Sequence, residues 1–177
     1  MSKLLLVTAL CVTLSGAMAA QAPAPVELKV GDRAPEFSLQ GTDGRMHTLA
    51  ENRGKAIVLA WYPKASTQGC TIECKSLTES QSAIQAYNVA YFMASVDTPE
   101  DNATFAKNNA ANFPLLSDTS KAVASAYGVL NPRGTANRWT FYIGADGRIA
   151  HIDRAVSPNQ AGQDLVAQLT ALKIARR

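Results

Sequence analysis

The fold class follows from residues 56–70, which read AIVLAWYPKASTQGC. The first seven, Ala56–Tyr62, are an unbroken apolar run, which is typical of a central strand buried on both faces. Pro63 ends the run, and from Cys70 to about Tyr87 the apolar side chains recur at helical spacing. A buried strand that leads through a short loop into a helix predicts an α/β fold. It also predicts a functional site in that loop, because ligand sites in open α/β sheets gather at the carboxyl ends of the strands.

The flanking segments extend the alternation of strands and helices. An N-terminal β-hairpin is predicted where Phe37–Leu39 and Met46–Leu49 flank the turn signal Asp43-Gly44. Thr98-Pro99-Glu100 has the features of a helix start: an N-cap, a proline and an acid in the first turn. Together the patterns predict a mixed β-sheet with helices on both faces. The other expected elements are a strand at 89–96, a helix at 99–108, an extended segment at 114–116, a helix at 120–127, paired strands at 139–143 and 149–152, and a helix from Ser157-Pro158 to about Lys173.

The composition fits one globular domain and excludes several classes of protein. The chain has 177 residues, 47% hydrophobic and 18% charged, which is typical of a packed core and excludes extensive disorder. Its 17 basic and 14 acidic residues leave a net charge of only +3. The basic residues are scattered, so no nucleic-acid partner is expected. Three cysteines are too few for a disulfide-rich scaffold.

Residues 1–19 are predicted to be a secretory signal peptide. A lysine precedes the apolar run Leu4–Leu14, and Ala17-Met18-Ala19 follows as a small-x-small cleavage site. An uncleaved membrane anchor is the alternative, but the run is too short to cross about 30 Å of hydrocarbon. Cleavage at site 19 or 20 leaves an extended, proline-containing leader at 20–27 and a domain at 28–177. We therefore expect an exported protein without stable membrane insertion, periplasmic or else secreted, in an oxidising compartment.

Cleavage removes Cys11 and leaves two cysteines, Cys70 and Cys74. Cys70 lies at the predicted start of a helix, where free backbone N–H groups and the positive end of the helix dipole favour the nucleophilic thiolate. Gly69 allows the backbone to approach closely, and the Thr67 hydroxyl is placed to hydrogen-bond the sulfur or an oxygen bound to it. An arginine would complete such a site, because its planar guanidinium can donate to two atoms at once.

Three sequence signatures resemble those of the peroxiredoxins and occur in the same order. The resemblance extends from about Val30 to Leu172, and the residues around the loop are similar to those of the bacterioferritin-comigratory, or peroxiredoxin Q, branch. The loop residues that match this branch are Tyr62-Pro63-Lys64 and Gly69-Cys70-Thr71. The three signatures are Val30-Gly31-Asp32-x-Ala34-Pro35-x-Phe37-x-Leu39, Pro63-x-x-x-Thr67-x-x-Cys70, and Arg138-x-Thr140-Phe141-x-Ile143 followed by Asp146-Gly147.

The resemblance implies a thioredoxin-like fold and the reduction of hydrogen peroxide and organic hydroperoxides, as antioxidant defence in the cell envelope. Cys70 would be the peroxidatic cysteine, which attacks the peroxide and becomes a sulfenic acid. Arg138, Thr67 and the backbone N–H groups of Gly69 and Cys70 would hold the peroxide oxygens, and Pro63 would shield the sulfur. No metal and no organic cofactor are implied. The partners would be a peroxide and a dithiol reductant, either a thioredoxin-like protein or a small thiol, and the protein would be a monomer or a weak dimer.

Cys74 departs from this branch, in which the resolving cysteine usually lies five residues after the peroxidatic one rather than four. Residues four apart on a helix have Cβ atoms about 5–6 Å apart, whereas a disulfide needs about 3.5–4.5 Å. The first helical turn would therefore have to unwind. Three alternatives remain for Cys74: it resolves the sulfenic acid, it is a bystander while an external thiol resolves, or it forms a permanent disulfide. Glu73 is either a solvated helix acid or a brace for Arg138.

Other functions fit the residues less well. A thiol–disulfide oxidoreductase of thioredoxin-like fold is the alternative, but such proteins usually carry Cys-x-x-Cys, which the chain lacks. A non-catalytic thioredoxin-like binding module is disfavoured because the site residues are present. His47 and His151 could join the two cysteines in a tetrahedral zinc site, but the spacing matches no known zinc pattern. Lys64 is expected to be a solvated loop residue.

Overall fold

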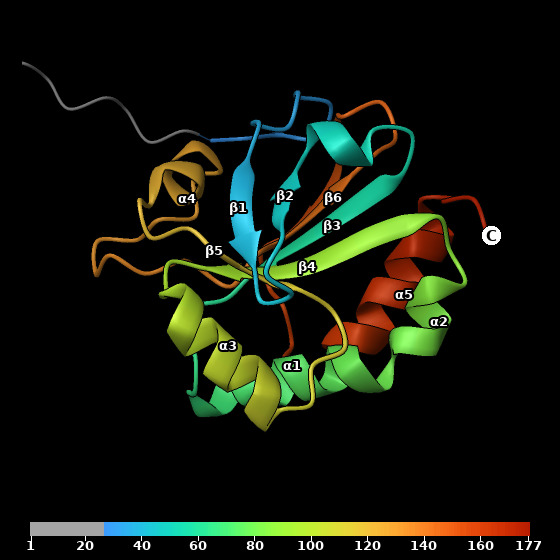
Figure 1. The fold of residues 1–177 in the computed structure, drawn as a ribbon. Helices are drawn as coiled ribbons and strands as arrows, with labels where there is room; N and C mark the ends of the chain where they lie inside the picture. Colours follow the sequence, from blue (N-terminus) through green and yellow to red (C-terminus); the bar gives the residue numbers. More distant parts are fainter. Residues whose placement is uncertain (1–26) are drawn as a thin grey trace, which may run out of the picture.

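The computed structural model describes residues 27–177, so the predicted signal peptide, its cleavage site and most of the leader lie outside the described residues. Within this range the strands form a seven-stranded mixed sheet in the order β2-β1-β5-β4-β3-β6-β7 (Figure 1). The predicted mixed sheet is therefore confirmed. The strands are β1 (Ser38–Gly41), β2 (Met46–Thr48), β3 (Ala56–Trp61), β4 (Val89–Ser95), β5 (Leu115–Ser117), β6 (Thr140–Ile143) and β7 (Ile149–Asp153).

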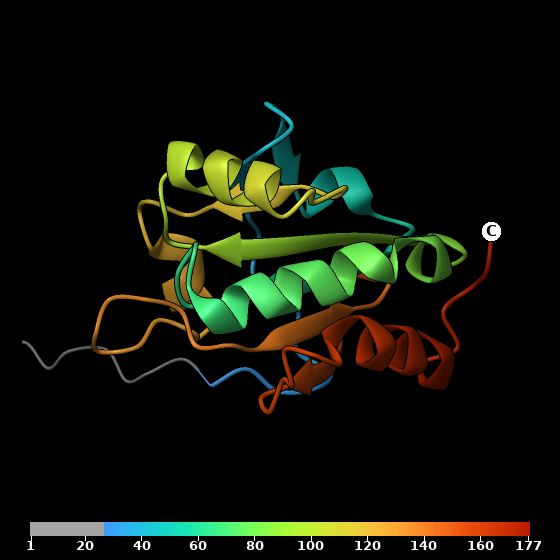
Figure 2. The same ribbon diagram turned by 90° about the horizontal axis from the view of Figure 1, so that it is seen from below.

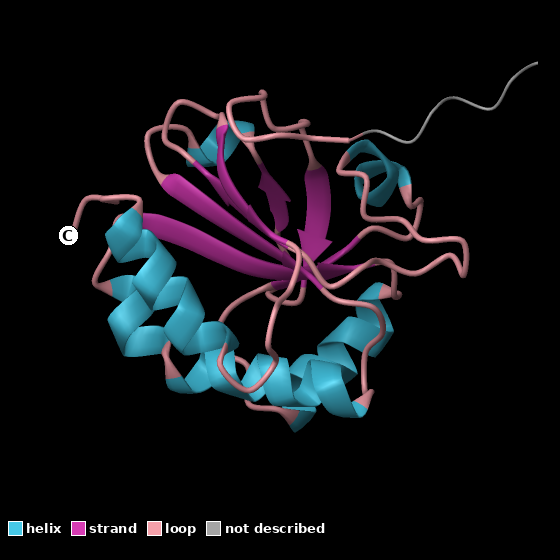
Figure 3. Cartoon of the chain, turned by 180° about the vertical axis from the view of Figure 1, so that it is seen from behind, coloured by secondary structure: helices cyan, strands magenta, loops and turns pink. Residues whose placement is uncertain are grey.

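The helices cover both faces of the sheet, but unequally. The helices labelled α1, α2, α3 and α5 lie below the sheet in Figure 1, and the view from below shows α1 between α3 and α5 (Figure 2). The view from behind shows the same layer gathered under the twisted strands (Figure 3). The other face is covered by α4, a short 3₁₀ helix at Ala50–Asn52 and irregular segments. The helices are α1 (Gln68–Glu79), α2 (Gln81–Gln85), α3 (Pro99–Asn108), α4 (Ala122–Ala126) and α5 (Ala161–Ala171).

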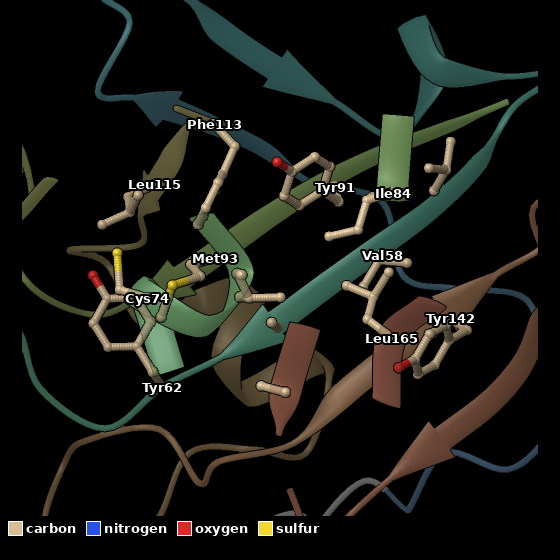
Figure 4. Close-up of a cluster of buried hydrophobic side chains, with 14 of the residues drawn as sticks. Val58, Tyr62, Cys74, Ile84, Tyr91, Met93, Phe113, Leu115, Tyr142 and Leu165 are labelled. Carbon is tan, nitrogen blue, oxygen red and sulfur yellow. The ribbon is translucent and has the colours of Figure 1, made fainter. Parts of the chain in front are cut away.

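Strand β3 contributes side chains to two core clusters, one on each face of the sheet. Val58 and Ala60 point into the cluster beneath the sheet, whereas Ile57 and Leu59 point into the cluster above it. All six residues of β3 are buried, as the unbroken apolar run predicts. β3 is parallel to β4 and antiparallel to β6, so it occupies the centre of the molecule. Figure 4 shows part of the lower cluster, where Cys74 lies near Tyr62 and Met93.

The helix starts were predicted with mixed success. The start of α3 is confirmed, because the Thr98 hydroxyl accepts a hydrogen bond from the Asp101 N–H at 3.1 Å. The expected helix at 70–87 begins earlier, at Gln68, and is divided at Ser80 into α1 and α2. No helix of the described chain is long and apolar enough to cross a membrane.

The start of the last helix was predicted wrongly at Ser157-Pro158, because α5 begins only at Ala161. The Ser157 hydroxyl bonds the Asn159 side chain at 2.7 Å instead of capping a helix. The Gln160 N–H donates to the Ser157 carbonyl at 3.0 Å and closes a turn. A Ser-Pro pair is compatible with either a turn or a helix start, and here it forms the turn.

Candidate active site

The sheet topology brings two distant segments of the chain to one edge. The loop Pro63–Thr67 leaves the carboxyl end of β3 and leads into α1. β6 is antiparallel to β3, with Thr140 opposite Ala60, so the residues just before β6 lie at the same edge. This arrangement places Arg138 beside Cys70 at the start of α1, although the two residues are 68 positions apart in the chain.

Cys70 is the third residue of α1, and its side chain is fully buried. The first bond of the helix runs from the Thr71 N–H to the Thr67 carbonyl, at 2.9 Å, so the N–H groups of Gly69 and Cys70 precede any helical partner. Arg138 Nη2 lies 3.2 Å from the Cys70 sulfur. The sulfur therefore faces a permanent positive charge and the positive end of a helix, both of which stabilise a thiolate.

Glu73 holds the guanidinium of Arg138 from the other side. Arg138 Nη1 forms an ion pair with Glu73 Oε2, while Nη2 faces Cys70. The Glu73 side chain is fully buried, and this burial raises the pKa of its carboxyl to about 7, although the charge of Arg138 opposes the rise. Of the two alternatives for Glu73, the structure therefore shows the brace and not the solvated acid.

Gly69 leaves room for the guanidinium. A Cβ atom built at this position would lie 3.2 Å from Arg138 Nη2, which is tighter than ordinary van der Waals contact. The glycine thus allows Arg138 to approach the helix start closely. The predicted role of Gly69 was a close approach of the backbone; the structure shows the close approach of a side chain.

Thr67 and Pro63 lie in the loop as expected, but the Thr67 hydroxyl does not point at the sulfur. It donates to the Lys64 carbonyl at 2.9 Å, so its single proton is engaged within the loop. Thr67 is the N-cap residue of α1 and is exposed. Pro63 is half-buried at the end of β3. A hydrogen bond from Thr67 to a bound peroxide and the shielding by Pro63 stay predictions.

Cys74 lies one helical turn beyond Cys70 and is also fully buried. Both are free thiols in the structure, so the permanent disulfide is not formed there. The Cys74 side chain packs in the lower core beside Tyr62 and Met93 (Figure 4). Burial raises the pKa of the Cys74 thiol to about 11. Cys74 is therefore a poor nucleophile while α1 stays folded.

Sequence reasoning missed Asp97, which lies just after β4 and is buried. Its carboxylate accepts a hydrogen bond from the Ala65 N–H at 2.8 Å and pairs with Lys64 Nζ at 2.5 Å. Asp97 therefore fastens the loop between β3 and α1 to the neighbouring strand. Lys64 is exposed, as expected for a solvated loop residue, and the ion pair with Asp97 is an additional contact. The position of Asp97 at the carboxyl end of a predicted strand was the signal available in the sequence.

The two histidines do not join the cysteines. His47 is in β2 and His151 in β7, at opposite edges of the sheet. His47 lies between the carboxylates of Asp43 and Glu51. Among residues 27–177, no group of three or more His, Cys, Asp or Glu side chains could hold a metal ion. The tetrahedral site considered from the sequence is therefore wrong in its geometry.

Comparisons with known proteins show which family the chain resembles. Residues 30–152 match the AhpC/TSA family. The chain is 35% identical over 132 residues to peroxiredoxin Bcp of Escherichia coli strain K12, an alignment that covers 71% of this chain and 85% of that protein. Peroxidoxin BcpB from Mycobacterium tuberculosis has a similar structure, with a TM-score of 0.75 and 27% identity over 82% of this chain and 98% of that one. The bacterioferritin comigratory protein of Xanthomonas campestris is similar at a TM-score of 0.71 and 25% identity, over 76% and 90%.

Proposed function

The chain belongs to the AhpC/TSA family of peroxiredoxins and is a thiol-dependent peroxidase, and we propose that Cys70 is its peroxidatic residue. The observation that carries this assignment is the contact of 3.2 Å between Arg138 Nη2 and the Cys70 sulfur. Family membership favours the peroxidase over the thiol–disulfide exchanger. Its substrates are peroxides, and its electrons come from a thioredoxin-like reductant.

The first step is an attack of the Cys70 thiolate on one peroxide oxygen. A sulfur–oxygen bond forms as the oxygen–oxygen bond breaks, and the bonding electron pair leaves with the second oxygen. That oxygen takes up a proton and departs as water or an alcohol, while Cys70 becomes a sulfenic acid. Arg138 Nη2 and the N–H groups at the start of α1 are donors for the charge that moves between the oxygens. Thr67 can join them once its hydroxyl turns from the Lys64 carbonyl.

The substrate class includes hydrogen peroxide and organic hydroperoxides. The Xanthomonas campestris relative is described by its alkyl peroxide reduction activity. In this chain the residues proposed to bind peroxide would contact only its two oxygens, so they do not select for a particular organic group. The sequence signatures and the relative together support both kinds of peroxide as substrates.

Cys74 is proposed to resolve the sulfenic acid after the start of α1 unwinds. Its thiol attacks the Cys70 sulfur, a disulfide forms, and the sulfenic oxygen leaves as water. The first turn of α1 lacks two features that stabilise a helix start, because it carries no acidic residue and its N-cap, Thr67, makes no capping side-chain bond in the described chain. Unwinding also brings the buried Cys74 into water, where its pKa returns toward the ordinary range for a thiol.

The peroxidase assignment is tested by following peroxide consumption with a dithiol reductant. The wild type and Cys74→Ser should oxidise Cys70 at similar rates, whereas Cys70→Ser should consume no peroxide above the uncatalysed rate. Equal, slow consumption by the wild type and Cys70→Ser would overturn the assignment.

The resolving role is tested by mass spectrometry after one equivalent of peroxide. An intramolecular Cys70–Cys74 disulfide supports it. A persistent Cys70 sulfenic acid beside a Cys74 that still reacts with an alkylating agent would assign resolution to an external thiol instead.

Export to the cell envelope is proposed from residues 1–19, with the periplasm as the destination and secretion as the alternative. The charge, apolar run and small residues of this segment occur in the order of a signal peptide. N-terminal sequencing of the protein from fractionated cells should give a chain that begins at Ala20 or Gln21 outside the cytoplasm. The reductant would then have to be a dithiol protein or a small thiol of that compartment, and sedimentation should show a monomer or a weak dimer.

A further inference from the structure

A small cavity is lined by Glu73, but not by Arg138 or Cys70. It lies between β3, α1, β6, β7 and α5, and has about 10 Å³ of space for a water-sized sphere. Three carboxylates line it, from Glu73, Asp153 and Asp164, together with the Thr140 and Tyr142 side chains. Such a volume is about the minimum that holds one water molecule.

One oxygen of Glu73 requires a partner in this cavity. Glu73 Oε2 is engaged by Arg138, but Oε1 is buried and finds no hydrogen-bond partner within residues 27–177. A buried carboxylate oxygen without a donor is costly. The cavity that Glu73 lines is small and has several polar groups on its wall, which are the conditions for an ordered internal water.

Asp153 is the second charged group close to this oxygen. It is the last residue of β7 and is half-buried, and its Oδ1 accepts a hydrogen bond from the Ala155 N–H at 2.8 Å. Its negative charge adds to burial in raising the pKa of the Glu73 carboxyl. Asp164, on α5, also lines the cavity and is exposed.

We propose that one internal water molecule bridges Glu73 Oε1 to the Thr140 hydroxyl and the Asp153 carboxylate, and that Asp153 is a positioning residue for Arg138. This inference rests on the proposed function of the Arg138–Cys70 contact. An ionised Glu73 pins the guanidinium against the sulfur, whereas a protonated Glu73 releases it. The water and Asp153 determine at which pH this change occurs, and so set the acidic limit of the peroxidase reaction.

The titratable groups around Glu73 shift the pKa of its carboxyl in different directions. Arg138, from the segment before β6, favours the ionised carboxyl, and Asp153, on β7, favours the protonated one. Asp164 on α5 and Tyr142 on β6 also line the cavity. Cys70 and Cys74 flank Glu73 on α1, and a thiolate at Cys70 would also favour protonation of Glu73.

The direct test is a carbon-13 NMR titration of the Glu73 carboxyl, which Glu73→Gln identifies by loss of its signal. Asp153→Asn keeps an acceptor for the Ala155 N–H and removes the charge, so it should lower the pKa of Glu73 by about one pH unit. Thr140→Val removes one partner of the water at nearly the same volume, so it should raise that pKa. Asp164→Asn is the matched control and should change it much less.

The kinetic test follows the rate of Cys70 oxidation by hydrogen peroxide against pH. The acidic fall in rate should move to lower pH in Asp153→Asn and to higher pH in Thr140→Val, with similar rates at alkaline pH. A Glu73 titration that neither variant moves, or that both move in the same direction, would overturn the proposal. The NMR titration needs no peroxide, so expected pKa changes in a protein without peroxidase activity would refute only the proposed function.

Discussion

At the scale of single residues, Arg138 has two nitrogen atoms with different partners. Nη1 pairs with Glu73 and Nη2 faces the Cys70 sulfur. A lysine has one ammonium group and cannot hold both positions at once. Arg138→Lys should therefore slow the oxidation of Cys70 by about 100-fold, the typical effect of losing one donor to a developing charge. Stopped-flow mixing with hydrogen peroxide measures this rate through the fluorescence of the two tryptophans.

Arg154 provides the control for that change. Its guanidinium lies 4.9 Å from the centre of the Trp139 ring and the residue is exposed. Arg154→Lys keeps the charge near the site without touching Cys70, so the rate should stay within about threefold of the wild type. If Cys70 is oxidised as fast in Arg138→Lys as in Arg154→Lys, the Arg138 guanidinium does not contribute to the reaction.

A substitution at Gly69 should affect the rate of Cys70 oxidation and the stability of the protein differently. Gly69→Ala should strengthen α1 by about 0.5–1 kcal/mol, because alanine is the better helix former. The added Cβ would lie 3.2 Å from Arg138 Nη2 and displace it from the sulfur. We expect the rate of Cys70 oxidation to fall by about tenfold or more while the free energy of unfolding stays equal or rises. Denaturant unfolding and stopped-flow kinetics on one preparation check both, with Gln68→Ala on the exposed side of the same turn as the control. A variant that lost stability and rate together would point to a distorted helix instead.

At the scale of secondary-structure elements, the loop from β3 to α1 depends on its attachment to β4. Asp97→Ala leaves the buried Ala65 N–H without its acceptor and should lower the free energy of unfolding by about 1–3 kcal/mol. The rate of Cys70 oxidation should fall as well, because the loop leads directly into α1. Lys64→Ala removes the exposed ion-pair partner of Asp97 but leaves the Ala65 bond in place, so its effect on the free energy of unfolding should be smaller. Equal losses in the two variants would contradict the role of the Ala65 bond.

The elements that the sequence predicts well are those specified by their own residues. β3 is such a case, since its unbroken apolar run is itself the pattern of a strand buried on both faces. α3 is another, since it begins where Thr98 supplies the cap. The start of α5 could not be predicted in the same way, because Ser157 has a nearby partner in Asn159 that favours a turn. The sequence pattern at this position is compatible with both a turn and a helix start, and it does not indicate which of the two forms.

The site residues divide in the same way, into those that can be predicted from their own segment and those that depend on tertiary contacts. Cys70 and its place in the first turn of α1 follow from the strand, the loop and the helix period. The brace from Glu73 stayed open, because helix periodicity alone does not say that Arg138 lies against that face. The Asp97 contact depends on which strand lies beside β3, and strand order is a tertiary property. The Thr67 hydroxyl bonds the Lys64 carbonyl, and the sequence pattern does not specify the side-chain rotamer that this bond requires.

At the scale of the whole molecule, the proposed disulfide should lower stability rather than raise it. A bond between Cys70 and Cys74 closes a loop of only a few residues, which contributes about 2 kcal/mol by restricting the unfolded chain. Forming it requires the start of α1 to unwind, and Glu73 lies between the two cysteines. The buried Glu73–Arg138 pair is then broken, which costs about 3–5 kcal/mol, and two buried thiols leave the core. The losses exceed the gain.

We therefore expect the protein oxidised by one equivalent of peroxide to melt at a lower temperature than the reduced protein. Hydrogen exchange should speed up over residues 68–79, the span of α1, and much less in β3 and β4, whose hydrogen bonds do not depend on the helix. Cys74→Ser is the matched control, since it can form the sulfenic acid but not the disulfide, and its helix should stay protected on oxidation. A melting temperature that rises on disulfide formation would mean that α1 accommodates the bond while folded. In that case the four-residue spacing between the cysteines would place no conformational step between the attack on peroxide and its resolution.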